Sequence, residues 1–150
     1  MPVVHLTRRY GFAASHRLHS AHLSDAQNAE TFGKCNNPHG HGHNYEVEIT
    51  VGGEVDSVTG RIIDLSALDR LAEREILAPF RYRDLNREVE AFRDAVPTTE
   101  NLALEVDRRL REAWGRAFPG SAAAVLEKVR IRETERNICE VSNENEKRPR

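Results

Sequence analysis

Hydrophobic and polar residues alternate with a period of two over three stretches of the chain, a pattern typical of half-buried β-strands. These stretches are 3–18, 41–51 and 125–134, and a fourth, shorter strand is predicted over 137–141. In the third stretch the apolar parity ends on a carboxylate, and its members are Val125, Val129, Ile131 and Glu133. We therefore predict four strands, two in each half of the chain.

Between the two pairs of strands, apolar residues recur every three to four positions, which predicts amphipathic helices. The longer helices are predicted over 65–77 and 98–118, and a short helix over 23–30 is predicted earlier, between the first and second strands. In chain order, 23–30 is the first helix, 65–77 the second and 98–118 the third. Ser24 and Thr98 are suitable N-caps for the first and third, and Pro79 is expected to end the second. The segment 80–97 is dense in charge and predicts a solvated connection. The two longer helices thus stand between the two pairs of strands.

Two histidines stand where the second strand begins, in the sequence His41-Gly42-His43. Residues i and i+2 of a strand share a face, so both imidazoles lie on the apolar side of the sheet. His16 falls on the apolar parity of the first strand. Three imidazoles match the protein ligands of a catalytic zinc site. A chance pair, and a buried, hydrogen-bonded His16, are the simpler alternatives.

Composition and charge narrow the class of protein. Charged residues make up 31% of 150 residues and the net charge is −2, which fits a soluble globular protein and argues against nucleic acid as a partner. No apolar run approaches the ~20 residues of a membrane span, and no signal peptide is apparent. Residues 1–142 read as a single domain, followed by a disordered polar tail over 143–150. The chain has two cysteines, and because no secretion signal is apparent, we expect both to be free thiols in a reducing cytoplasm.

Three further groups have both a chemical and a plain structural interpretation. Cys35 lies in a turn near the histidine pair, where it could act as a base or nucleophile or be an inert buried thiol. Glu133 ends an apolar face, and a buried carboxylate needs a partner. That partner could be the amine or guanidine-like edge of a substrate, or Glu133 could form an ordinary surface salt bridge. Thr98 and Glu100 could simply initiate the helix that follows them.

Taken together, these motifs resemble the 6-pyruvoyl-tetrahydropterin synthase family, which includes the bacterial 6-carboxy-tetrahydropterin synthases. The resemblance covers about residues 10–141 and is strongest to the animal-type branch. The segments that carry it are Phe12–Ser20, Phe32–Pro38, Gly40–Tyr45, Pro97–Glu100 and Glu133–Thr134.

The resemblance implies an α+β tunnelling fold (T-fold), in which an antiparallel four-stranded sheet carries two helices on one face. It also implies that subunits join edge to edge into a homohexamer, a dimer of trimers. Such closure would cover the open edges of a small sheet.

The resemblance further implies zinc held by His16, His41 and His43, with Cys35 as general base. The pterin would be anchored through its amino-pyrimidine edge by Thr98, Thr99, Glu100 and Glu133. The implied reaction converts dihydroneopterin triphosphate to 6-pyruvoyl- or 6-carboxy-tetrahydropterin and releases triphosphate.

One departure from the family pattern concerns proton transfer. Members carry an Asp-His pair just after the first long helix, and this chain has Arg81-Tyr82 there. An arginine cannot act as a base near neutral pH, and a tyrosine titrates near ~10. Arg81 could instead contact a polyanionic side chain, and Tyr82 could act as a weaker proton carrier. The alternative function is therefore a pterin-binding homologue with altered or weak activity, such as side-chain cleavage of a related pterin.

Overall fold

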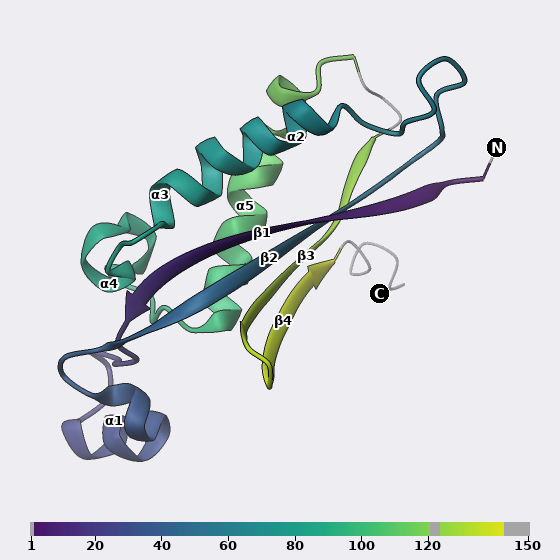
Figure 1. Ribbon diagram of the computed structural model, residues 1–150. Coiled ribbons are helices and arrows are strands. Elements are labelled where there is room, and N and C mark those ends of the chain that lie inside the picture. The colour runs from purple at the N-terminus through teal and green to yellow at the C-terminus, as the bar shows by residue number, and fades with distance from the viewer. Residues whose placement is uncertain (1, 121–123, 143–150) are drawn as a thin grey trace, which may run out of the picture.

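A computed structural model describes residues 2–120 and 124–142 of the chain. Its centre is one antiparallel sheet whose strand order follows the sequence, β1-β2-β3-β4 (Figure 1). The strands are β1 Val4–His16, β2 His41–Gly53, β3 Val125–Thr134 and β4 Asn137–Ser142. β1 and β2 are the longest, and their pairing brings His16 opposite His41 at one end of the sheet.

The helices lie on one face of this sheet, apart from α1, which lies beyond the end of β1 and β2 (Figure 1). They are α1 Asp25–Phe32, α2 Leu65–Ala72, α3 Ala78–Phe80, α4 Leu85–Glu88 and α5 Thr99–Ala117. A π-helical turn, Glu73–Leu77, joins α2 to α3, and 3-10 turns cover Gly33–Asn36 and Glu90–Phe92. None of the helices in these described ranges is long and apolar enough to cross a bilayer. The four-stranded antiparallel sheet with helices on one face is the predicted T-fold.

The core forms between the helices and the inner face of the sheet. Val47, Ile49 and Ile131 of the sheet are fully buried, as are Leu68 and Leu110 of the helices. Each such side chain contributes ~1.5–3 kcal/mol of transfer free energy. The outer face is polar and carries ion pairs between strands, which join Arg9 to Glu48, Arg130 to Glu48 and Lys128 to Glu140. This division fixes which side chains of β1 and β2 point toward the helices.

The predicted N-caps are confirmed. Ser24 accepts a hydrogen bond from Gln27 N at the start of α1, and Thr98 accepts one from Asn101 N at the start of α5. The predicted end of the second helix is wrong, because the helical path runs past Pro79 to Phe80. Proline lacks an N–H, so the carbonyl of Glu75 loses its regular partner; Arg109 Nη1 donates to that oxygen at 3.4 Å. The π-helical turn accommodates the proline ring within the helix.

The prediction of a solvated connection over 80–97 is also wrong. This segment contains α4 and a 3-10 turn, and its apolar side chains Leu85, Val89 and Phe92 are almost fully buried. Their spacing of four and three residues places them on one side, while the charged residues between them stay on the surface.

The parity predicted for β3 fails at its start. Val125 is 43% exposed and Leu126 is buried, the reverse of the prediction. A bulge lies between Thr50 and Val51 on the partner strand, because Thr50 pairs with Lys128 and Val51 with Leu126. The extra residue, Glu127, shifts the alternation by one position. The first strand is also shorter than predicted and ends at His16, after which Leu18 N donates to the carbonyl of Cys35. The predicted tail over 143–150 lies outside the described residues.

Candidate metal and substrate site

The sheet register brings the three predicted histidines together. His16, the last residue of β1, pairs with His41, and His43 lies opposite Ala14. The Nε2 atoms of His16 and His41 are 3.0 Å apart. His16 is buried, whereas His41 and His43 are partly exposed. One candidate ligand atom from each histidine, together with one oxygen of Glu133, lies within 4.8 Å of the others.

Glu133 approaches the same cluster from β3. Its Oε1 lies 2.8 Å from His43 Nε2 and 3.4 Å from His16 Nε2. Its Oε2 accepts hydrogen bonds from Thr99 Oγ1, at the start of α5, and from Asn137 Nδ2 of β4 at 2.9 Å. Hydrogen bonding with His16 above all, and then with Thr99 and Asn137, lowers the pKa of Glu133 to about 2, against the opposing effect of burial. The carboxylate is thus ionised and faces the imidazoles.

Two groups orient the His16 ring. Its Nδ1 donates to the carbonyl oxygen of Pro97 at 2.8 Å, and the Tyr45 hydroxyl lies 3.2 Å from the same nitrogen. A carbonyl can only accept, so Nδ1 carries a proton, and in the neutral ring Nε2 then presents its lone pair to the cluster. Metal-bound histidines are held in this way by carbonyl or carboxylate partners.

The ring nitrogens of the cluster fit a metal ion. His43 Nε2 is buried and close to Glu133, but it is not aligned for a hydrogen bond, so its polar atom is left unsatisfied. Burial lowers the pKa of His41 and of His43, and the neighbouring imidazoles lower that of His41 further. Neutral imidazole is the form that binds metal. Three nitrogen donors beside one carboxylate suit a divalent transition metal such as zinc.

Gly40 allows the chain to pass closely behind His16. Its φ is +72°, in the left-handed region that favours glycine, and a Cβ there would lie 2.9 Å from the carbonyl oxygen of His16. The turn that leads into β2 therefore depends on the absence of a side chain at this position.

The predicted pterin anchors lie at the start of α5. Thr98 caps the helix, Thr99 is buried against Glu133, and Glu100 is exposed on the first turn. Glu100 Oε1 accepts a hydrogen bond from the thiol of Cys139 on β4, with a sulfur–oxygen distance of 3.4 Å. Two carboxylates, Glu100 and Glu133, thus face the same junction between α5 and β4.

Cys35 lies in the 3-10 turn Gly33–Asn36 and is partly buried. The turn is fixed to the end of β1, because Asn36 Nδ2 donates to the carbonyl of Leu18 and Arg17 Nε donates to the carbonyl of Asn36. Cys35 does not belong to the metal-ligand cluster of the described chain.

Arg81 and Tyr82 lie at the surface, outside the histidine cluster. Arg81 forms a two-pronged ion pair with Glu73, at 3.1 and 3.0 Å, and Tyr82 is 82% exposed. The backbone of this segment is fixed to β1, because Tyr82 N donates to Ala13 O and Ser15 N donates to Arg83 O. Neither residue belongs to the histidine cluster of the described chain, although Tyr82 and His43 line the same open pocket beside β1.

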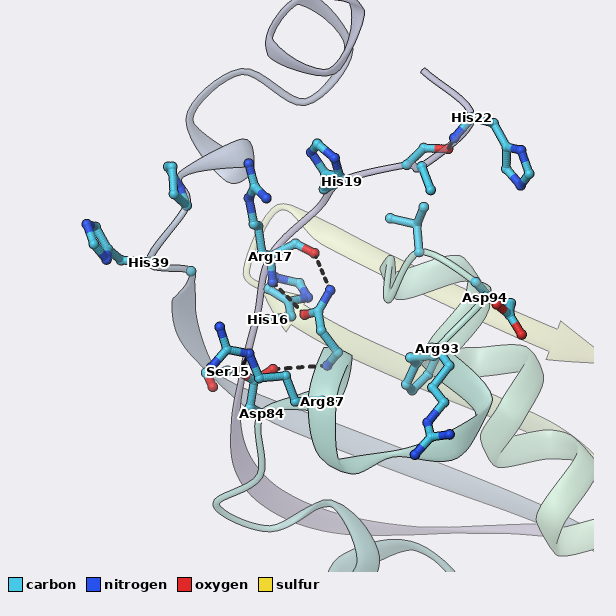
Figure 2. Close-up of a pocket in the computed structure, with 18 residues that line it drawn as sticks. Ser15, His16, Arg17, His19, His22, His39, Asp84, Arg87, Arg93 and Asp94 are labelled. Carbon is cyan, nitrogen blue, oxygen red and sulfur yellow. Dashed lines mark hydrogen bonds and ion pairs between the residues drawn. The ribbon is translucent and has the colours of Figure 1, made fainter. Parts of the chain in front are cut away.

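A cavity of about 660 Å³ adjoins the cluster at His16. Figure 2 shows that its walls come from the end of β1 and the loop after it, the turn before β2, and α4 with the segment that follows it, with arginine, histidine and aspartate side chains around it. The charged and imidazole groups are Arg17, Arg87, Arg93, His19, His22, His39, Asp84 and Asp94. The three guanidinium groups outnumber the two carboxylates, so the cavity can receive an anionic group.

Three contributors to the site were missed in the sequence. Tyr45 shares the parity of His41 and His43, so the alternating pattern held that signal. Asn137 and the carbonyl of Pro97 had no local signal, because their contacts with Glu133 and His16 arise only from the fold.

Comparison with known proteins agrees with this fold. A family model described as 6-pyruvoyl tetrahydropterin synthase matches residues 5–144. The 6-pyruvoyl tetrahydrobiopterin synthase of Homo sapiens is 44% identical over 133 residues, which are 89% of this chain and 87% of that protein. The enzyme of that name from Poecilia reticulata is 44% identical over 134 residues, 89% and 86% of the two chains.

Among solved structures, 6-pyruvoyl tetrahydropterin synthase of Caenorhabditis elegans superposes with a TM-score of 0.85 at 40% sequence identity. The superposition covers 95% of this chain and 97% of that one. With the family model, the curated relatives and the structure in agreement, the chain belongs to the 6-pyruvoyl tetrahydropterin synthase family of lyases.

Proposed function

We propose that this protein is a zinc-dependent lyase that converts dihydroneopterin triphosphate to 6-pyruvoyl- or 6-carboxy-tetrahydropterin and releases triphosphate. The observation that carries the proposal is the convergence of His16, His41 and His43 with Glu133 at one end of the sheet. The unsatisfied nitrogen of His43 and the bond that fixes His16 to Pro97 support a metal there.

The chain's own residues would divide the work as follows. His16, His41 and His43 would hold zinc, which supplies Lewis acidity that makes nearby hydroxyl and C–H groups of a substrate more acidic. Glu100 and Glu133 would accept hydrogen bonds from the amino-pyrimidine edge of the pterin, with Thr99 holding Glu133 in place. Thr98 would support them by fixing the start of α5.

Cys35 would act as the general base that takes a proton from the substrate side chain. Its turn is fixed to the end of β1, the strand that also carries His16. The cavity beside His16 supports a substrate with a polyphosphate, because three arginines line it and planar guanidinium groups bind phosphate oxygens well.

A second candidate is a pterin-binding protein with weak or altered turnover, such as side-chain cleavage of a related pterin. The observation that favours it is the position of Arg81 and Tyr82, one of which is engaged by Glu73 while the other is exposed. Neither side chain offers a proton relay to the cluster within one chain.

Incubation of the zinc-loaded protein with dihydroneopterin triphosphate separates the two candidates. Release of triphosphate, with a rate proportional to enzyme concentration, is expected for the lyase. Tight pterin binding without triphosphate release at any protein concentration would leave the second candidate. Product analysis by mass then distinguishes a 6-pyruvoyl from a 6-carboxy side chain.

We also propose a homohexamer that works in the cytoplasm. Both cysteines are free thiols, as suits a reducing compartment. β1 and β4 are the two edges of the sheet, and open edges favour closure by further copies. A sedimentation mass near the 17.0 kDa of one chain, at micromolar concentration, would refute the hexamer.

A further inference from the structure

Cys139 contacts a carboxylate that the proposed function assigns to the pterin. It lies on β4, and both Cys139 and Val141 pack against the core, whereas Ile138, the residue before Cys139, is 39% exposed. The thiol therefore points to the helix side of the sheet, where its sulfur lies 3.4 Å from Glu100 Oε1. Two residues earlier, Asn137 donates to Glu133 Oε2. Alternate residues of one strand thus each donate to one of the two carboxylates.

The thiol is a hydrogen-bond donor at neutral pH. Burial, and then the hydrogen bond with Glu100, raises the pKa of Cys139 to about 11. A protonated thiol is a poor nucleophile, so this cysteine is suited to a structural contact rather than to redox chemistry. Its partner lies on the exposed first turn of α5, where a glutamate without a contact would move among several rotamers.

We propose that Cys139 is a positioning residue for pterin recognition, because its thiol holds the Glu100 carboxylate in one orientation toward the amino-pyrimidine edge of the ligand. The inference rests on the proposed function. A carboxylate has about four lone-pair sites, so Glu100 can accept the thiol and still receive two donors from a flat heterocycle. An orientation fixed before binding reduces the entropy lost when the ligand arrives.

The test measures binding of neopterin, by its fluorescence, to the zinc-loaded full chain. Cys139→Val keeps the volume and removes the donor, so the Kd for neopterin should rise by about 3–10-fold, the effect of freeing one side chain. Cys139→Ser restores a donor and should stay within about twofold of wild type. Ile138→Val, on the opposite face of β4, is the matched control and should change nothing. With dihydroneopterin triphosphate, Cys139→Val should raise KM and leave kcat unchanged.

A double-mutant cycle separates positioning from packing. In a Glu100→Gln background, Cys139→Val should change the Kd by less than about twofold, since the carboxylate through which it acts is gone. An equal effect in both backgrounds would show that Cys139 acts through packing and would overturn the inference. So would a Cys139→Val protein that binds neopterin as tightly as wild type.

Two outcomes distinguish this inference from the function on which it rests. If wild-type protein binds no neopterin, the proposed function fails and the inference falls with it. If wild type binds and Cys139→Val is unchanged, only the inference fails. Should Cys139→Val not fold, alkylation of Cys139 in the wild-type chain by iodoacetamide decides instead: saturating neopterin should slow it at least threefold, and an unchanged rate would overturn the inference.

Discussion

The histidine cluster and the Arg81–Tyr82 segment are both anchored to the end of β1, yet they face opposite environments. His16 is 2% exposed and points toward the helices, whereas Tyr82 is 82% exposed and points to solvent. The cluster is complete within one chain, with ligand atoms within 4.8 Å of one another. The histidine cluster is therefore built against the core, while the Arg81–Tyr82 segment lies on the surface of this chain.

The exposed segment is nonetheless well fixed. Tyr82 has a φ of +60°, which is uncommon for a residue with a side chain and costs on the order of 1 kcal/mol. The hydrogen bond from Tyr82 N to Ala13 O, at 2.7 Å, holds this conformation, and Ser15 N donates to Arg83 O beside it. The exposed side chains thus project from a backbone that is tied to β1.

The largest expected effect comes from changes to the buried histidine cluster. Zinc affinity should fall in each of the variants His16→Ala, His41→Ala and His43→Ala. The fall should exceed the ~10²-fold loss of affinity that follows when a group supporting a metal ligand is changed. Zinc per chain, measured by mass spectrometry of the metal, is the readout. His39→Ala removes an exposed imidazole outside the cluster and should keep full zinc content. Full occupancy in all three cluster variants would refute the zinc assignment.

The next prediction concerns the exposed Arg81–Tyr82 segment. If Arg81 and Tyr82 mark a lost relay, the double variant Arg81→Asp/Tyr82→His should raise triphosphate release by about 10²-fold or more, the scale of a restored acid–base group. The new aspartate would lie near Glu73, so Arg81→Ala/Tyr82→Ala controls for the lost ion pair. A fall in activity in the Asp-His variant, relative to wild type, would show that Arg81 and Tyr82 already support a different chemistry.

A third change sharpens the role of Glu133 within the cluster. Glu133→Gln keeps an oxygen that can accept from Thr99 and Asn137 but removes the charge. If Glu133 binds the pterin, zinc content should hold while pterin affinity falls by roughly 10–100-fold, the value of a charge-assisted hydrogen bond. Loss of zinc with Glu133→Gln would instead make the carboxylate a metal ligand, and the pterin assignment would then rest on Glu100.

The smallest effect lies far from the cluster and serves as its reference. Asp69 of α2 accepts hydrogen bonds from Arg8 and Tyr10, and these lower its pKa below the ordinary value of 3.8. Because the folded-state pKa is below the unfolded one, the contact stabilises the fold above about pH 4 and is lost as pH falls through the folded pKa. Asp69→Asn should lower Tm slightly at pH 7, and the difference should shrink as the pH falls below the ordinary pKa of 3.8. A difference independent of pH would point to packing, since these groups are partly exposed.

Most of the histidine cluster could be predicted from the sequence. The parity of two strands was enough to put His16, His41 and His43 on one face, because the side-chain period of a strand is fixed by its backbone. The same rule failed at Val125, where a bulge in the pairing with β2 inserts one residue. A bulge depends on the partner strand, so the local sequence of β3 could not indicate it.

Other errors came from giving charge too much weight. The spacing of Leu85, Val89 and Phe92 was visible in the sequence, but the arginines and glutamates between them suggested a solvated loop. Pro79 was expected to end a helix, and only the tertiary contact of Arg109 with the carbonyl of Glu75 explains how the chain continues. The contacts of Asn137 and Cys139 with two carboxylates could not be predicted, because they join β4 to residues 4 and 39 positions away through the folded sheet.

Gly40 carries a consequence for genetic screens of this protein. Any side chain at that position would meet the carbonyl of His16 in a backbone conformation that suits glycine. A missense change there would displace His16, a residue of the histidine cluster, without touching a chemically reactive group. A survey that ranks variants by the chemistry of the altered residue would pass over it, whereas one that selects for metal content would recover it alongside changes to the histidines themselves.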